Sequence, residues 1–81
     1  MTVYTVLLFG ITKDLLKEKS LKITLEQPVT VAEFLLQVKK QFPALQNLPS
    51  LRIAADHHFP EADFMLLPQM EIALIPPVSG G

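Results

Sequence analysis

The residues with the clearest chemical potential are the last two, Gly80 and Gly81, which place a diglycine at the end of the chain. A terminal glycine carries a carboxylate with no Cβ beside it, on a backbone that adopts conformations closed to other residues, so it can pass through a narrow channel into another protein's active site. An ionised α-carboxylate is a poor electrophile at neutral pH. The pattern therefore predicts a terminus that a second protein must activate.

Two prolines come shortly before the diglycine, and they predict the conformation of the chain that leads to it. Proline fixes φ near about −65° and has no amide hydrogen, so the pair should leave the domain as a stiff, extended segment. At about 3.3 Å per residue, residues 76–81 would reach up to roughly 20 Å. We expect a folded domain over residues 1–75 and an extended tail over 76–81. The residues expected to enter a partner ahead of Gly81 are Pro76, Pro77, Val78, Ser79 and Gly80.

The composition is that of one small globular domain of 81 residues, 49% hydrophobic and 19% charged. Seven basic and eight acidic residues give a net charge of −1, and acidic residues interrupt the densest lysine cluster, so we expect no nucleic-acid partner. No apolar run approaches the roughly 20 residues of a membrane span, and the N-terminus lacks the pattern of a secretory signal. We expect a cytoplasmic protein with no membrane partner.

The other candidates for chemistry are weak. The chain has no cysteine, which excludes disulfides, thiolate metal sites and cysteine nucleophiles. His57 and His58 are adjacent and would point to opposite sides of an extended segment, so we expect no metal site. Glu61 and Asp63 have no partner base and are interpreted as a solvated loop and a helix cap. Since motifs for phosphate binding and nucleophilic catalysis are also missing, we expect no bound cofactor and no catalysis by the chain alone.

The elements that must position the tail begin with an apolar run at residues 3–9, typical of a central strand buried on both faces. Apolar spacing predicts a short helix within residues 11–19, capped by Thr12 or Asp14. Strict alternation at residues 21–26 predicts a half-buried strand antiparallel to the first.

The strongest helix signal comes next. Thr30 and Glu33 form a capping-box pattern, and Pro43 prevents continuation of the helix. Its apolar stripe consists of Val31, Phe34, Leu35, Val38 and Phe42.

Two further strands complete the pattern, at residues 51–55 and 70–75. We expect the segment between them to be irregular, with a short edge strand near Phe59 and a helical turn near residues 63–66. This order predicts an α+β domain with the β-grasp arrangement of ubiquitin: a mixed sheet of four to five strands with one main helix on one face. The first and last strands would lie side by side in its middle.

The first strand offers apolar side chains to both faces of that sheet. Tyr4, Val6 and Leu8 can serve the core, which leaves Leu7 and Phe9 on the other side with Ala73 or Ile75. Two interpretations stay open: loops cover this second face, or Leu7, Phe9 and Ile75 form an exposed patch for a partner.

Four segments resemble the small, sulfur-carrying subunit of molybdopterin synthase. They are Leu-Leu-Phe at residues 7–9, Thr-Val-Ala-Glu-Phe-Leu at 30–35, Leu-Arg-Ile-Ala at 51–54 and the ending at 71–81. Ubiquitin-like proteins and the thiamine sulfur carrier share a bare diglycine, whereas the diproline before it is typical of the molybdopterin family. The ending is therefore the most specific part of the resemblance, which covers essentially the whole chain.

The resemblance implies a mechanism for the inert carboxylate. An adenylating enzyme related to ubiquitin-activating enzymes would use ATP to convert the Gly81 carboxylate to an acyl adenylate, and a sulfur donor protein would displace AMP to leave a thiocarboxylate. The tail would then enter the large catalytic subunit of molybdopterin synthase and give its sulfur to cyclic pyranopterin monophosphate. In the family the complex is a heterotetramer, and the small subunit catalyses nothing on its own.

Two other functions share the first steps of this chemistry. A sulfur carrier for thiamine or tRNA thiolation would form the same thiocarboxylate and differ in its acceptor. A ubiquitin-like protein modifier would form the same adenylate and end in an isopeptide bond between Gly81 and a target lysine.

Overall fold

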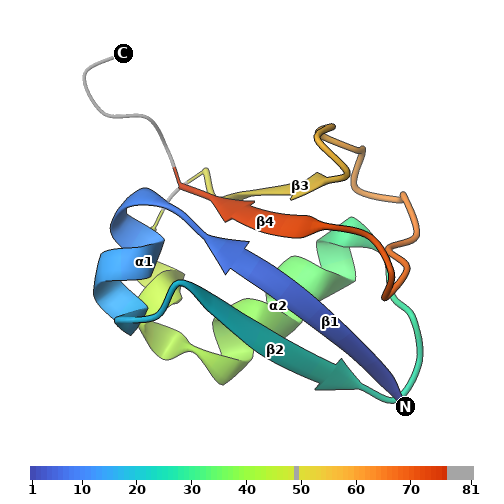
Figure 1. Cartoon of the computed structure of the whole chain (residues 1–81), viewed down its shortest axis with the longest axis horizontal. Helices are drawn as coiled ribbons and strands as arrows, with labels where there is room; N and C mark the ends of the chain where they lie inside the picture. Colours follow the sequence, from blue (N-terminus) through green and yellow to red (C-terminus); the bar gives the residue numbers. More distant parts are fainter. Residues whose placement is uncertain (49, 77–81) are drawn as a thin grey trace.

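The computed structural model describes residues 1–48 and 50–76, which form a four-stranded mixed sheet with one long helix packed on one face (Figure 1). The strands are β1 (Thr2–Leu8), β2 (Ser20–Leu25), β3 (Arg52–Ala55) and β4 (Ile72–Ile75), in the order β2-β1-β4-β3. The helices are α1 (Gly10–Leu16), α2 (Val31–Gln41) and the short 3₁₀ helix η1 (Pro43–Asn47). β1 is parallel to β4 and antiparallel to β2, and β3 is antiparallel to β4. The predicted β-grasp arrangement is confirmed.

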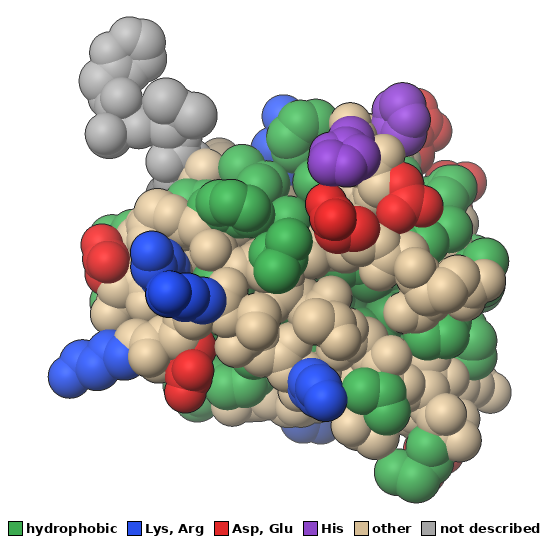
Figure 2. All heavy atoms as spheres, in the orientation of Figure 1, with side chains coloured by type: hydrophobic (Ala, Val, Ile, Leu, Met, Phe, Trp, Pro, Cys, Tyr) green, Lys and Arg blue, Asp and Glu red, His purple; other side chains and the backbone are tan. Residues whose placement is uncertain are grey.

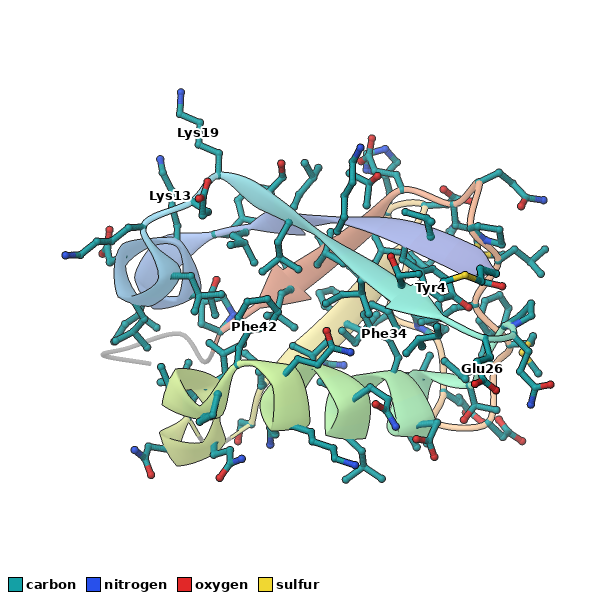
Figure 3. The ribbon with its side chains drawn as sticks, turned by 90° about the horizontal axis from the view of Figure 1, so that it is seen from below. Tyr4, Lys13, Lys19, Glu26, Phe34 and Phe42 are labelled. Carbon is teal, nitrogen blue, oxygen red and sulfur yellow. The ribbon has the colours of Figure 1, made fainter. Side chains whose placement is uncertain are left out.

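β1 is a central strand, as predicted, but it is buried on one face only. Tyr4, Val6 and Leu8 are buried, whereas Val3 is 46% exposed and Leu7 is half-buried. α2 packs on the Tyr4 side of the sheet (Figure 3). The prediction of burial on both faces was wrong because apolar composition alone does not show that a second layer covers the other face.

The core lies between the sheet and the predicted stripe of α2. Phe34 is fully buried, and its ring meets that of Tyr4 edge to face with the centroids 5.0 Å apart (Figure 3). Thr30 Oγ1 accepts the Glu33 N–H at 3.3 Å and caps the helix. The Glu33 carboxylate accepts a hydrogen bond from Gln37 at 2.9 Å, so the structure does not form the second half of the predicted capping box.

α1 is capped by a residue inside its own first turn. The residue at its N-cap is Phe9, which offers no polar side chain, and the Thr12 hydroxyl hydrogen-bonds to the Phe9 backbone instead. Thr12 is fully buried, and Leu16 packs against the core one turn later. Asp14, the alternative cap, is exposed.

The segment between β3 and β4 is irregular, as predicted, but it contains neither the edge strand near Phe59 nor the helical turn over residues 63–66. Two isolated bridges, Ala55 to His58 and Thr30 to Met65, pair it with the rest of the domain. Local turns therefore shape this segment.

Tyr4 attaches that segment to the sheet. Its hydroxyl donates to the Leu66 carbonyl oxygen at 2.8 Å and accepts the Val29 N–H at 3.1 Å, and Leu66 is fully buried. We expect Tyr4→Phe to lower the free energy of unfolding by about 1–2 kcal/mol, because both backbone groups lose this partner. Urea unfolding measures the change.

Thr24→Val is the matched control, because it also removes one hydroxyl, but from an exposed position on β2. We expect this control to change the free energy of unfolding by less than about 0.5 kcal/mol. Equal stability of Tyr4→Phe and the wild type would show that the loop is held without the hydroxyl.

Candidate functional site

The described chain reaches Pro76, the residue after β4. The predicted site residues Pro77, Val78, Ser79, Gly80 and Gly81 lie outside the described residues. The structure does describe the surface from which they continue. β1 and β4 are parallel neighbours with Leu8 opposite Leu74, so the carboxyl ends of both strands lie at the same end of the sheet, beside α1 (Figure 1). The corner that joins β1 to α1 therefore lies next to Pro76.

An apolar patch lies at this end of the sheet, on the face opposite α2. It consists of Leu7, Phe9, Ala73 and Ile75, which we call the open-face patch. Leu7 is opposite Ala73. Phe9, whose backbone is extended, and Ile75 each come two residues after this pair, and alternation along an extended chain puts them on the same face. Phe9 is 48% exposed and the other three side chains are half-buried. Figure 2 shows hydrophobic side chains gathered on this face below the point where the described chain stops.

The structure thus places the three predicted patch residues, Leu7, Phe9 and Ile75, together on one face. The described part of the chain leaves this face partly open to solvent. Contact between the patch and a partner stays a prediction.

A cation borders the patch on the β3 side. Arg52 is opposite Ile75, and its guanidinium carbon lies 4.3 Å from the centre of the Phe59 ring. This cation–π contact holds the charge at the edge of the apolar surface. Arg52 was not among the predicted site residues, although its alternation with the buried Ile53 is the signal that places it on the face opposite the core.

The lysine cluster lies around the turn between α1 and β2. Lys13, Lys17 and Lys19 line a shallow hollow together with Asp14 and Glu18. Lys13 and Lys19 point away from the ribbon (Figure 3). Because charges of both signs line the hollow, it carries no strong field of one sign, which favours solvated surface over a nucleic-acid site.

The two histidines lie in the turn that leaves β3. His57 Nε2 is 3.6 Å from Glu71 Oε1, and both side chains are largely exposed, so the pair contributes little to stability. Within residues 1–48 and 50–76, no group of three or more His, Cys, Asp or Glu side chains is placed to hold a metal ion.

Glu61 and Asp63 are also exposed, and the Glu61 carbonyl oxygen accepts the Phe64 N–H in a turn at 3.0 Å. None of the helices in the described ranges has both the length and the apolar character needed to cross a membrane.

The sequence pattern that defines the ThiS family matches residues 6–81 of the chain, including the terminal diglycine.

Several solved structures share the fold. A Pyrococcus furiosus protein assigned as subunit 1 of molybdopterin converting factor superimposes with a TM-score of 0.83 at 17% identity, over 96% of this chain and 100% of that one. SAMP1 from Haloferax volcanii gives a TM-score of 0.79 at 19% identity, over 98% and 99% of the two chains. A protein–protein complex of subunits 1 and 2 of molybdopterin-converting factor from Helicobacter pylori gives 0.64 at 24% identity, over 99% and 100%. At these identities the likeness shows a common fold.

Proposed function

The chain belongs to the ThiS family, and from this premise we propose that it is a sulfur carrier loaded at Gly81. The observation that carries the proposal is the extent of the family match, which covers residues 6–81 and so includes both the core and the diglycine. Carriers of this type are generally non-catalytic. The chemistry is therefore assigned to partner enzymes, and this chain supplies the carboxylate and the surface that those enzymes bind.

Loading takes two steps, and the first of them requires ATP. An adenylating enzyme of the ubiquitin-activating type catalyses attack of the Gly81 carboxylate on the α-phosphorus of ATP, which releases pyrophosphate and forms an acyl adenylate. A sulfide nucleophile from a sulfur donor protein then attacks the acyl carbon and AMP leaves, so that one carboxylate oxygen is replaced by sulfur. Because the chain contains no cysteine, the sulfur must come from outside it.

For the acceptor, we propose cyclic pyranopterin monophosphate, bound by the large catalytic subunit of molybdopterin synthase in a heterotetramer. Two observations support this choice over other sulfur acceptors. Pro76 and Pro77 precede the diglycine, and a diproline at this place is typical of the small synthase subunit that the chain resembles. Two of the similar structures are described as subunit 1 of molybdopterin converting factor, one of them in complex with subunit 2. In this proposal the open-face patch contacts the large subunit and residues 76–81 extend into its active site.

A second candidate is a ubiquitin-like protein modifier, which the structural likeness to the archaeal modifier protein SAMP1 favours. The modifier would use the same Gly81 adenylate. Its product would be an isopeptide bond to a lysine of another protein. A carrier for thiamine or tRNA thiolation would differ from the proposed function in the acceptor alone.

Intact-mass spectrometry separates these functions. The chain is incubated with ATP, the adenylating enzyme and inorganic sulfide, with a reaction lacking ATP as the control. We expect the mass increase that follows from exchanging one oxygen for one sulfur at Gly81, and sulfur transfer to the pterin when the large subunit is added. Covalent adducts with other proteins, with no thiocarboxylate, would support the modifier. Transfer to a thiazole precursor or a tRNA alone would replace the pterin as acceptor.

A further inference from the structure

We propose that Gly10 and Thr12 are positioning residues that hold Pro76 against the end of β1 and so set the direction in which residues 77–81 leave the domain. This inference rests on the proposed function, because the direction of the tail matters only if Gly81 must reach the active site of a partner.

Gly10 makes room for the proline ring. Its φ is +55°, in the left-handed region that favours glycine. A Cβ placed on Gly10 would lie 3.0 Å from Pro76 Cγ and 3.9 Å from its Cδ. Non-bonded carbon atoms prefer about 3.5–4.0 Å, so the ring occupies space that a side chain at this position would need. The first residue after β4 is therefore fitted to the corner that follows β1.

Thr12 holds the same corner in place. Its hydroxyl accepts the Phe9 N–H at 3.2 Å and donates to the Phe9 carbonyl oxygen at 2.6 Å, and the Thr12 N–H donates to that oxygen at 3.2 Å. Thr12 is fully buried, so water does not reach its hydroxyl. Both backbone groups of the residue before Gly10 are thereby fixed, and Gly10 presents a defined surface to the ring.

Small changes at this contact would be magnified at the reacting carboxylate. For a tail extended as the prolines predict, the five residues after Pro76 span about 16 Å, and a tilt of about 15° at the base would move the end by about 4 Å. A displacement of 1 Å at a reacting atom can cost about 100-fold in rate. A rigid attachment at Pro76 would therefore affect the chemistry more than it affects binding of the domain.

A double-mutant cycle with Gly10→Ala and Pro76→Ala tests the contact. Gly10→Ala introduces the strain of a non-glycine residue at positive φ whether residue 76 is Pro or Ala. The clash with the proline Cγ arises only in the chain that keeps Pro76. We expect Gly10→Ala to lower kcat for thiocarboxylation by about tenfold or more per folded molecule, with KM for the adenylating enzyme changed less than about twofold. In the Pro76→Ala background the same substitution should lower kcat by less than about twofold. The same cycle should show at least about threefold coupling in the equilibrium constant of unfolding, a readout that needs no partner.

Thr12 provides a matched pair of variants. Thr12→Val keeps the shape and removes the hydroxyl, and we expect it to lower kcat as Gly10→Ala does. Thr12→Ser keeps the hydroxyl and should restore most of the rate. Equal effects of Gly10→Ala in both backgrounds, or a loss of stability with kcat per folded molecule unchanged, would overturn the inference.

The proposed function can fail separately from this inference. A wild-type chain that the adenylating enzyme never converts to a thiocarboxylate would reject the sulfur-carrier function. The unfolding cycle would then decide the contact alone: coupling would support it, and strict additivity would overturn it.

Discussion

Adding a single glycine after Gly81, or deleting Gly81, should lower sulfur transfer to the acceptor by about 1,000-fold or more. Either change moves the reacting carbonyl by about 3.3–3.6 Å along an extended chain. Misplacement of a reacting group by even 1 Å can cost about 100-fold, so a shift of one residue should abolish productive transfer. Single-turnover assays with the thiocarboxylated chain, or with the chain, ATP and the adenylating enzyme, measure the loss.

The stability of the domain should not change with the tail. The buried core residues lie between Tyr4 and Leu74, so we expect the free energy of unfolding of both tail variants to stay within about 0.5 kcal/mol of the wild type. One glycine added before Met1 is the matched control, because Met1 is 95% exposed and precedes β1, at the end of that strand opposite Gly10 and Pro76 (Figure 1). A chain lengthened at Gly81 that still transferred sulfur at the wild-type rate would contradict Gly81 as the loaded residue.

Phe9→Asp should weaken binding to the large synthase subunit by about 30-fold or more. Phe9 is a half-exposed aromatic ring in the open-face patch, and it precedes Gly10, which lies next to Pro76. Aromatic anchors of this kind commonly contribute 2 kcal/mol or more at an interface, and a carboxylate buried there without a partner adds a further cost. The dissociation constant, measured by calorimetry or surface plasmon resonance, reports the change.

Val3→Asp is the matched control for this prediction. Val3 projects from the same face of β1 and is 46% exposed, close to the 48% of Phe9, but it lies six residues away, about 20 Å along an extended strand. We expect it to change the dissociation constant by less than about threefold. Equal loss in both variants would indicate a general effect of charge on the sheet. No loss in either would remove the open-face patch from the interface.

Much of the fold could be predicted from local patterns. Alternation along β2 and the stripe of α2 follow from periods of 2 and 3.6 residues, and the structure confirms both elements together with the cap at Thr30. The segment between β3 and β4 was predicted less well, because its form depends on two isolated bridges and on the Tyr4 hydroxyl rather than on a repeating pattern.

The candidate site also has features that could be predicted from the sequence and features that could not. The diglycine and the diproline are visible in the order of residues, and the roles of Gly80 and Gly81 stay predictions because they lie outside the described residues. The positions of Arg52 against Phe59 and of Pro76 against Gly10 were not predicted. Each contact joins a helix or strand to a residue in an irregular segment, and no periodic pattern in the sequence predicts such a contact.

By itself, the sequence determined the order of the four strands, α1 and α2, the inward stripe of α2, and a diproline that comes shortly before a diglycine. These features depend on neighbouring residues, and their physical causes act within a few positions. Only the tertiary structure decided that one face of β1 stays partly open and that Gly10 meets Pro76. The parallel pairing of β1 with β4 brings together two strand ends that are more than sixty residues apart, and the energy that selects this pairing is burial of the shared core, which no single segment contains.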